Sequence, residues 1–270
     1  FDAVAITAPP HVHLPMAKDA ALKGCHLLIE KPIGMNCQGW DEVVKICKDK
    51  KLANYVAFCH RHIPYTTKLK EIVDSGRIGR VVHANMRWGS YLPDWHPYED
   101  YRTYYMAKKE QGGGALLDES HGIDLMRYIL GEVKGVFAIV DTISDLEIST
   151  DDAAFLTLRL QSGALAHINF DLQSRHARIN FELIGTKGNI LWDRMEHSIK
   201  VYDIERKSWE VFNYNINTLL SMYPTQAQHF IKCVRGEAKS IIDIEDALKT
   251  QKVVDAAFAS SDSGKYMELN

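Results

Sequence analysis

QGGGALLDESHGIDLMRYILG, residues 111–131, is the stretch around which the rest of this chain is organised. Three glycines in a row remove every β-carbon from Gly112 to Gly114, so the backbone can approach a flat ligand closely or turn sharply. The apolar residues that follow have helical spacing and predict a helix that ends at Gly131. The stretch therefore predicts a helix whose start faces a ligand.

Three polar side chains of this helix form one row. At about 100° per residue, Asp118 and His121 lie roughly 60° apart around the helix, and Asp124 lies roughly 60° further on. An imidazole between two carboxylates could act as a general base. Because such pairs also occur in structural networks, a surface or core histidine held by Asp118 explains the same residues. The rest of the sequence must decide between the two.

Length and composition indicate a globular protein that binds small molecules. The chain has 270 residues, of which 46% are hydrophobic and 25% charged, and its formal net charge is -3. No run approaches the ~18 apolar residues of a membrane span, and no block of Lys and Arg indicates a nucleic-acid surface. We therefore expect no membrane and no nucleic-acid partner.

The cysteines and histidines give no metal signature. The five cysteines include no C-x-x-C pair, and none of the twelve histidines stands in an H-E-x-x-H spacing. An odd number of unpaired cysteines fits reduced thiols in a cytoplasm. The sequence thus predicts a cytoplasmic protein with no metal.

The first 60 residues alternate between short apolar runs and helical segments. Strands are expected at residues 3–6, 26–29 and 54–59, and helices at about 11–23 and, after Asn36 as N-cap, at 40–47. This is a parallel α/β layer, whose ligands lie beyond the carboxyl ends of the strands. Two polar turns lie there, residues 7–13 and 30–32. Lys31 could stabilise developing charge on a substrate hydroxyl, although a solvated surface lysine explains the Lys-Pro pair more simply.

The remaining residues predict a helix, a largely antiparallel sheet and two closing helices. A helix is expected at 66–75, and strands at 80–89, 136–141, 153–160, 164–172, 177–184, 190–192, 199–202 and 209–212. Between them, residues 91–105 are rich in aromatic and polar side chains, which suit a carbohydrate ligand, although a packed Ω-loop is an equal alternative. The candidate substrate contacts in this loop are Trp95, His96, Tyr101 and Arg102.

Several short motifs follow one another in a characteristic order. They are DAVAITAPPHVH at residues 2–13, EKP at 30–32, Arg61 three residues before Pro64, GRIG at 76–79, GGG at 112–114 with Asp118 and HGID at 121–124, and SSDSG at 260–264. This ordered series spans nearly the whole chain and resembles the glucose-fructose oxidoreductase / inositol dehydrogenase / MocA (Gfo/Idh/MocA) family of NAD(P)-dependent oxidoreductases. The implied fold is α/β plus α+β. Residues 1–60 would be the C-terminal half of a Rossmann domain, and residues 61–270 a substrate-binding domain with a mostly antiparallel, open-faced sheet and helices on one face.

The chain departs from the family pattern in two ways. The G-x-G-x-x-G turn that cradles the cofactor pyrophosphate is absent, so we expect ~55 to 65 upstream residues that are not in this sequence, and the choice between NAD and NADP stays open. The family usually has its aspartate four residues before its histidine, whereas Asp118 precedes His121 by three. Both spacings keep one helix face, so the roles are carried over to these residues, with Asp124 as the fallback partner.

The resemblance implies that hydride moves between nicotinamide and a carbinol carbon of a sugar, cyclitol or sugar derivative, including acetamido or sialic-acid-like sugars. Lys31 would hydrogen-bond the reacting oxygen, His121 would be the general base, and Asp118 would orient His121 or share the proton relay. A second subunit would cover the open sheet in a homodimer or homotetramer. The implied cofactor contacts are Thr7, Ala8, Pro9, His11, Glu30, Lys31 and Pro32, the implied substrate contacts include Arg61, Asp118 and His121, and His13 packs in the first helical turn.

Three other functions stay open at this point. The family also includes redox-assisted glycosidases, in which the nicotinamide transiently oxidises the sugar. A sensing protein could keep the fold without turnover, although retention of both Lys31 and His121 argues against it. A purely structural subunit is disfavoured by the polar turns at the strand ends.

Overall fold

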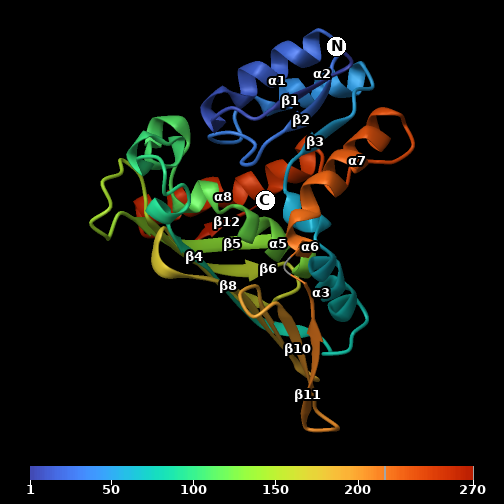
Figure 1. The fold of residues 1–270 in the computed structure, drawn as a ribbon, viewed down its shortest axis with the longest axis vertical. Coiled ribbons are helices and arrows are strands. Elements are labelled where there is room, and N and C mark those ends of the chain that lie inside the picture. The colour runs from blue at the N-terminus through green and yellow to red at the C-terminus, as the bar shows by residue number, and fades with distance from the viewer. Residues whose placement is uncertain (216, 270) are drawn as a thin grey trace.

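The computed structural model describes residues 1–215 and 217–269, which form two sheets bridged by helices (Figure 1). The small sheet has the parallel strand order β1-β2-β3. Helices α1 and α2 pack against it through a core that includes Ala17, Trp40 and Val43. The predicted parallel α/β layer is therefore confirmed. Its elements are β1 (Ala3–Ile6), α1 (His13–Leu22), β2 (His26–Ile29), α2 (Trp40–Asp49) and β3 (Asn54–Val56).

Two boundaries in this layer differ from the prediction. The prediction that Asn36 caps α2 is wrong, because its side-chain oxygen accepts from the N–H of Gln38 at 2.9 Å and the helix begins after Gly39. Gly39 has a φ of 82°, which a glycine adopts without strain. The third strand ends at Val56, three residues early, and the chain then forms the 3₁₀ turn η2 (Cys59–His62).

The large sheet is mostly antiparallel, as predicted. Within the described residues its order is β11-β10-β9-β8-β4-β7-β6-β5-β12, and the β4–β7 pair is parallel while the other pairs are antiparallel. The strands are β4 (Val81–Tyr91), β5 (Val133–Asp141), β6 (Ala153–Leu160), β7 (Leu165–Asp171), β8 (Gln173–Gly185), β9 (Asn189–Asp193), β10 (Ser198–Asp203), β11 (Ser208–Asn213) and β12 (Met267–Glu268).

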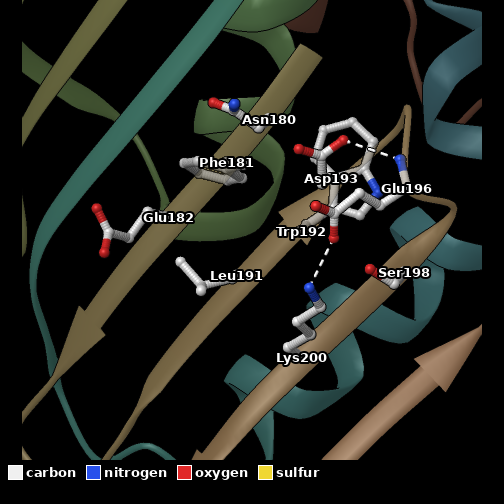
Figure 2. A pocket seen from close by; sticks show the side chains of 9 residues that line it. All are labelled: Asn180, Phe181, Glu182, Leu191, Trp192, Asp193, Glu196, Ser198 and Lys200. Carbon is white, nitrogen blue, oxygen red and sulfur yellow. Dashed lines mark hydrogen bonds and ion pairs between the residues drawn. The ribbon is translucent and has the colours of Figure 1, made fainter. Parts of the chain in front are cut away.

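Helices cover one face of this sheet and leave the other open. In β5 the buried Val136 and Ala138 alternate with the exposed Phe137 and Ile139. The buried side faces α8, since the N–H of Ala138 donates to Ser260 Oγ at 2.9 Å. On the open face, a hollow crosses β8, β9 and β10 and is lined by polar side chains such as Glu182 (Figure 2). The helices on the covered side are α3 (Pro64–Asp74), α4 (Ala115–Asp118), α5 (His121–Leu130) and α8 (Ile244–Ser263).

The C-terminal helices connect the two sheets. Helix α6 (Asn217–Leu220) leads into α7 (Met222–Val234), whose Phe230 joins Ile244 and Leu248 of α8 in the core of the small sheet. The N–H of Val56 also donates to Ile242 O at 2.9 Å. A domain boundary at residue 60 stays a prediction. Across the described residues, the helices are too short or too polar to cross a membrane.

Candidate active site

Three strand ends of the small sheet meet at one edge. β1 leads into Thr7, β2 into Glu30 and Lys31, and β3 into the η2 turn that carries His60. The imidazole of His13 ties the first two turns together, because Nε2 lies 2.6 Å from Ala8 O and Nδ1 lies 3.0 Å from Pro32 O. His13 is fully buried, which confirms its predicted packing role. The turns after the three strands thus form a ledge, which His13 holds together, at the edge where parallel sheets bind ligands.

Lys31 forms the centre of this ledge. Its ammonium donates to Asp118 Oδ1 at 3.0 Å and to Asp118 O at 2.7 Å, with the two side chains 16% and 5% exposed. Burial disfavours the ammonium, but the carboxylates of Asp118 and Glu119 outweigh it and raise the pKa of Lys31. Lys31 is therefore a charged ammonium that protein partners fix in place, which contradicts its interpretation as a solvated surface lysine.

Tyr105 bonds the same carboxylate as Lys31. Its hydroxyl donates to the same oxygen, Asp118 Oδ1, at 2.6 Å. Tyr105 belongs to the turn η5 (Tyr105–Ala107), at the end of the aromatic loop. The loop therefore touches the site through Tyr105, a residue that the sequence analysis did not select.

Two glutamates next to the Lys31–Asp118 pair have pKa values above the usual value for a glutamate. Burial raises the pKa of Glu30, and burial together with the charge of Asp118 raises the pKa of Glu119 to about 8. Glu30 Oε2 also accepts from the N–H of Lys31 at 3.1 Å. Because Glu119 favours the protonated form and Asp118 bonds Lys31 directly, Asp118 is the carboxylate that balances Lys31.

His121 is buried among rings and is not held by Asp118. The helix breaks at Glu119 and Ser120, so α4 ends at Asp118 and α5 starts at His121. The imidazole lies 4.4 Å from the ring of His60 and 6.1 Å from that of Trp88, centroid to centroid. Its Nδ1 has no hydrogen-bond partner among the described residues. Among the described residues Asp118 bonds Lys31 and Tyr105 and makes no hydrogen bond to His121, because the helix break turns Asp118 toward Lys31, so its part in the proton relay stays a prediction.

Both imidazoles in this cluster are neutral at ordinary pH. Burial, with the charges of Arg194 and Lys31, lowers the pKa of His60 to about 3. Burial, with its neighbours His60, Lys31 and Arg194, lowers the pKa of His121 well below the usual value. Each ring can thus accept a proton only transiently, as a base in a dry site does.

Arg61 and Asp124 belong to a buried ion network instead. The guanidinium of Arg61 donates to both oxygens of Asp124, at 2.9 and 2.5 Å, and pairs with Asp246 at 2.7 Å. Arg127 bonds Asp246 as well, at 2.9 Å. The charged groups of Arg61 and Asp124 are buried and bond one another, so a substrate contact by Arg61 and a role of Asp124 as fallback partner of His121 stay predictions without support from these contacts. The network fixes α5 against α8.

The triple glycine lets segments of this chain approach one another closely. A β-carbon at Gly112 would lie 2.7 Å from Pro10 Cβ, and one at Gly113 would lie 2.4 Å from two backbone oxygens. Gly114 has a φ of 110°, and a β-carbon there would lie 2.2 Å from Asp151 Oδ1. Asp151 in turn accepts from the N–H of Leu116 at 2.8 Å. The glycines do allow a close approach, but the neighbours that require it are protein atoms, so a helix start that faces a flat ligand stays a prediction.

The four loop candidates have other partners. Trp95 Nε1 donates to Ser90 Oγ at 2.7 Å, and His96 packs edge-on to Tyr104, 5.0 Å between centroids. The hydroxyl of Tyr101 accepts from the N–H of Glu147 at 3.1 Å. Arg102 pairs with Asp100 at 2.9 Å and with Glu147. In the described residues these contacts hold the loop together and do not reach Lys31 or His121, so their substrate contact stays a prediction.

One group of side chains has the composition of a zinc site. Cys59, His60 and His121 each offer a ligand atom, and these atoms lie within 4.8 Å of one another. A thiol with two imidazoles is a ligand set that zinc accepts. The positive charges of Lys31 and Arg194, however, act on both imidazoles and would also repel a dication. We therefore assign no metal to this cluster.

Comparison with protein families agrees with this geometry. Residues 1–58 match the family described as "Oxidoreductase family, NAD-binding Rossmann fold", and residues 66–191 match the "GFO/IDH/MocA C-terminal domain". The chain belongs to the Gfo/Idh/MocA family. The resemblance seen in the sequence, the fold class and the expectation of an oxidoreductase with a nicotinamide dinucleotide cofactor are confirmed at this level.

Several relatives of this Gfo/Idh/MocA protein act on sugars or cyclitols by name. The scyllo-inositol 2-dehydrogenase (NAD(+)) of Bacillus subtilis is 25% identical over 100% of this chain and 78% of its own length. The levoglucosan dehydrogenase of Pseudarthrobacter phenanthrenivorans is 28% identical over 70% of this chain, which spans only 55% of that protein. A structure of levoglucosan dehydrogenase with NADH and levoglucosan has the same fold, with a TM-score of 0.88 at 22% identity over 100% of this chain and 80% of that one.

Proposed function

We propose that this protein transfers a hydride between NAD(P) and a hydroxyl-bearing carbon of a sugar, cyclitol or sugar derivative. The observation that carries the proposal is the part-buried ammonium of Lys31, which Asp118 fixes and whose charge acts on the neutral imidazole of His121. A dehydrogenase of this kind has to stabilise an alkoxide and move one proton, and the two residues supply a cation and a base. The relatives named as sugar and cyclitol dehydrogenases support the substrate class.

The ledge fits the nicotinamide half of a dinucleotide. Thr7 and His11 are exposed there, and Ala8 and Pro9 are partly exposed, so these turns offer backbone and side-chain atoms to a ligand. His13 fixes the turns, and the unpartnered Nδ1 of His121 gives the buried side of the site a free polar atom. We propose Thr7, Ala8, Pro9, His11, Glu30, Lys31 and Pro32 as the cofactor contacts.

The mechanism follows from the charge states of the site. When bound, the nicotinamide supplies acceptance or donation of the hydride. Lys31 donates a hydrogen bond to the reacting oxygen and stabilises negative charge on it. In oxidation, His121 takes the hydroxyl proton while the C–H bond breaks and the C=O bond forms, and in reduction it returns that proton. Asp118 keeps Lys31 charged and in place.

We propose further that the protein works as a homodimer or homotetramer in the cytoplasm. On the open face of the large sheet, Phe137, Ile139, Phe155 and Leu165 are each 40–56% exposed. Apolar side chains gathered on one sheet face are typical of a surface that a second sheet covers. All five cysteines are free thiols, which supports a reducing compartment.

The test begins with cofactor binding. The protein is titrated with NADH and NADPH by nicotinamide fluorescence, and sugars, cyclitols and acetamido sugars are then screened by absorbance of the reduced nicotinamide. Lys31→Met should lower kcat at least about 100-fold, which is the cost of losing a preorganised electrostatic contact to the reacting oxygen. The control is Lys18→Met, which alters an exposed pair with Glu42.

Each other outcome has a definite meaning. Wild-type turnover by Lys31→Met would refute the assignment of Lys31. Binding of NADH without turnover of any sugar would support a sensing protein or a redox-assisted glycosidase instead. Absence of cofactor binding by the full-length protein would refute the proposed function.

A further inference from the structure

Arg194 is a charged side chain of the site that the mechanism above does not use. It follows β9, is half-buried, and its N–H donates to Ile179 O at 2.9 Å. Its guanidinium forms no hydrogen bond or ion pair with the described residues, although such a group offers five donors. The other arginines beside the core, Arg61 and Arg127, have all their charge compensated by carboxylates. A half-buried cation without a partner is a feature that a ligand can explain.

The strand places Arg194 on the side of the sheet that faces the site. Trp192 is buried and stacks on Tyr65 of α3, with 5.2 Å between ring centroids. Arg194 lies directly after β9, but its N–H continues the β8–β9 ladder to the buried Ile179, so the alternation of side chains extends to Arg194 and places it on the side of Trp192. Ile179, to which Arg194 bonds, pairs with Trp88 of β4, and the Trp88 ring lies 5.0 Å from that of His60 and 6.1 Å from that of His121, so this side leads to the site.

The charge of Arg194 acts on site groups from several separate elements. It contributes to lowering the pKa of His60 and His121, after burial, and it acts on Glu119 at the helix break. These groups come from η2, α5 and the α4–α5 junction, so the guanidinium lies within range of all three. Burial is the larger cause in each case, and the influence of Arg194 agrees with its position next to Ile179, which pairs with Trp88.

The balance of charges in the site determines what Arg194 can bind. Lys31 is neutralised by Asp118, and Glu119 favours its protonated form. One uncompensated positive charge is left, that of Arg194. A carboxylate carries one negative charge and matches the guanidinium fork with two parallel hydrogen bonds. A phosphate carries nearly two negative charges and would leave one of them without a counterion here.

We propose that Arg194 binds a carboxylate of the substrate, so that the preferred substrate is a sugar acid rather than a neutral sugar. The inference rests on the proposed hydride transfer and specifies its substrate class. Arg194 would hold the carboxylate while Lys31 and His121 act on a hydroxyl elsewhere on the same ring.

The experiment compares sugars that differ only in the acid group. Initial rates are measured for D-glucuronate against D-glucose and D-galacturonate against D-galactose, with the corresponding hexose 6-phosphates as a third arm. The wild type should prefer at least one uronate over its hexose by more than about tenfold in kcat/KM. Arg194→Gln should lower kcat/KM for that uronate by about 10- to 100-fold, mainly through KM, which is the loss of a hydrogen-bonded charge pair.

Two further variants separate recognition from structure. Arg194→Lys should retain part of the preference, because it keeps the charge but loses the fork. Arg206→Gln, which changes an 82% exposed arginine in the β10–β11 turn, should leave both substrates unaffected. Since Arg194 has no side-chain partner in the part of the chain that the structure describes, Arg194→Gln should also keep the Tm of the wild type.

Three results would overturn the inference while leaving the proposed function intact. They are equal turnover of neutral sugars and uronates, an unchanged preference in Arg194→Gln, and a preference for hexose phosphates. A fall in Tm with no change in preference would likewise assign Arg194 a structural role. By contrast, absence of turnover for every sugar, with or without a charged group, would be a failure of the proposed function itself.

Discussion

Removal of the Tyr105 hydroxyl should weaken the pair that positions the active-site cation. In Tyr105→Phe, Asp118 Oδ1 loses a donor at 2.6 Å and keeps Lys31 Nζ at 3.0 Å. The side chain of Asp118 is only 5% exposed, so water replaces the lost donor poorly. A hydrogen bond to a charged group contributes about 1.5–3 kcal/mol net, and we take about 2 kcal/mol for this partly buried one.

That magnitude predicts two measurable effects. The Tm of Tyr105→Phe should fall by about 4 to 8 °C, since about 1 kcal/mol corresponds to about 2 to 4 °C in a chain of this size. If the same energy holds Asp118 and Lys31 in the catalytic geometry, kcat should fall by about 30-fold, while the Kd for NADH stays unchanged. Tm is measured by calorimetry and kcat with the substrate found in the screen.

A neighbouring tyrosine provides the matched control. The hydroxyl of Tyr104 donates to His96 O at 3.2 Å, within the aromatic loop. Tyr104→Phe should therefore change kcat by less than about twofold. A double-mutant cycle of Tyr105→Phe with Asp118→Asn isolates the interaction and should give a coupling of about 1 to 2 kcal/mol. If the cycle is additive and kcat is unchanged, the hydroxyl does not position Asp118 and the reasoning fails.

Two other predictions concern acid stability and assembly. Because the pKa of His60 is about 3 in the folded chain and near 6.5 when unfolded, unfolding takes up a proton between these values, and stability falls as the pH falls. His60→Gln should flatten this dependence by up to about 1.4 kcal/mol per pH unit in urea titrations, and an unchanged slope would show that His60 is charged when folded. Phe155→Lys, on the open sheet face, should convert the oligomer to monomers in light scattering, whereas a monomeric wild type would rule out assembly through this face.

The sheets could be predicted because their patterns are local. Parallel strands with short links, alternating strands and turn residues between them identify both sheets, and the strand at residues 153–160 has the predicted bounds. Boundaries failed where polar side chains bond to nearby backbone. Asn36 carries the residue type of an N-cap but closes a two-residue turn instead. Residue type alone does not distinguish these two uses.

The site was predictable in position but not in pairing. Proximity to strand ends identified Lys31, and the same rule applied to the third strand would have found His60, which follows it by four residues. Spacing along one helix suggested that Asp118 holds His121, yet the structure has a break at Glu119 and Ser120. The break depends on partners far away in sequence, because Lys31 and Tyr105 both bond Asp118. Contacts between residues far apart in sequence produce no periodic pattern in it, so spacing alone could not predict them.

Separation of Asp118 from His121 gives the two residues complementary tasks. An aspartate bonded to His121 would favour the charged imidazole and raise its pKa. Here Asp118 instead raises the pKa of Lys31, while burial lowers that of His121. The site thus keeps a permanent cation next to a neutral base. Hydride transfer with one mobile proton needs that combination, since the cation must stay on the oxygen while the base gains and loses the proton.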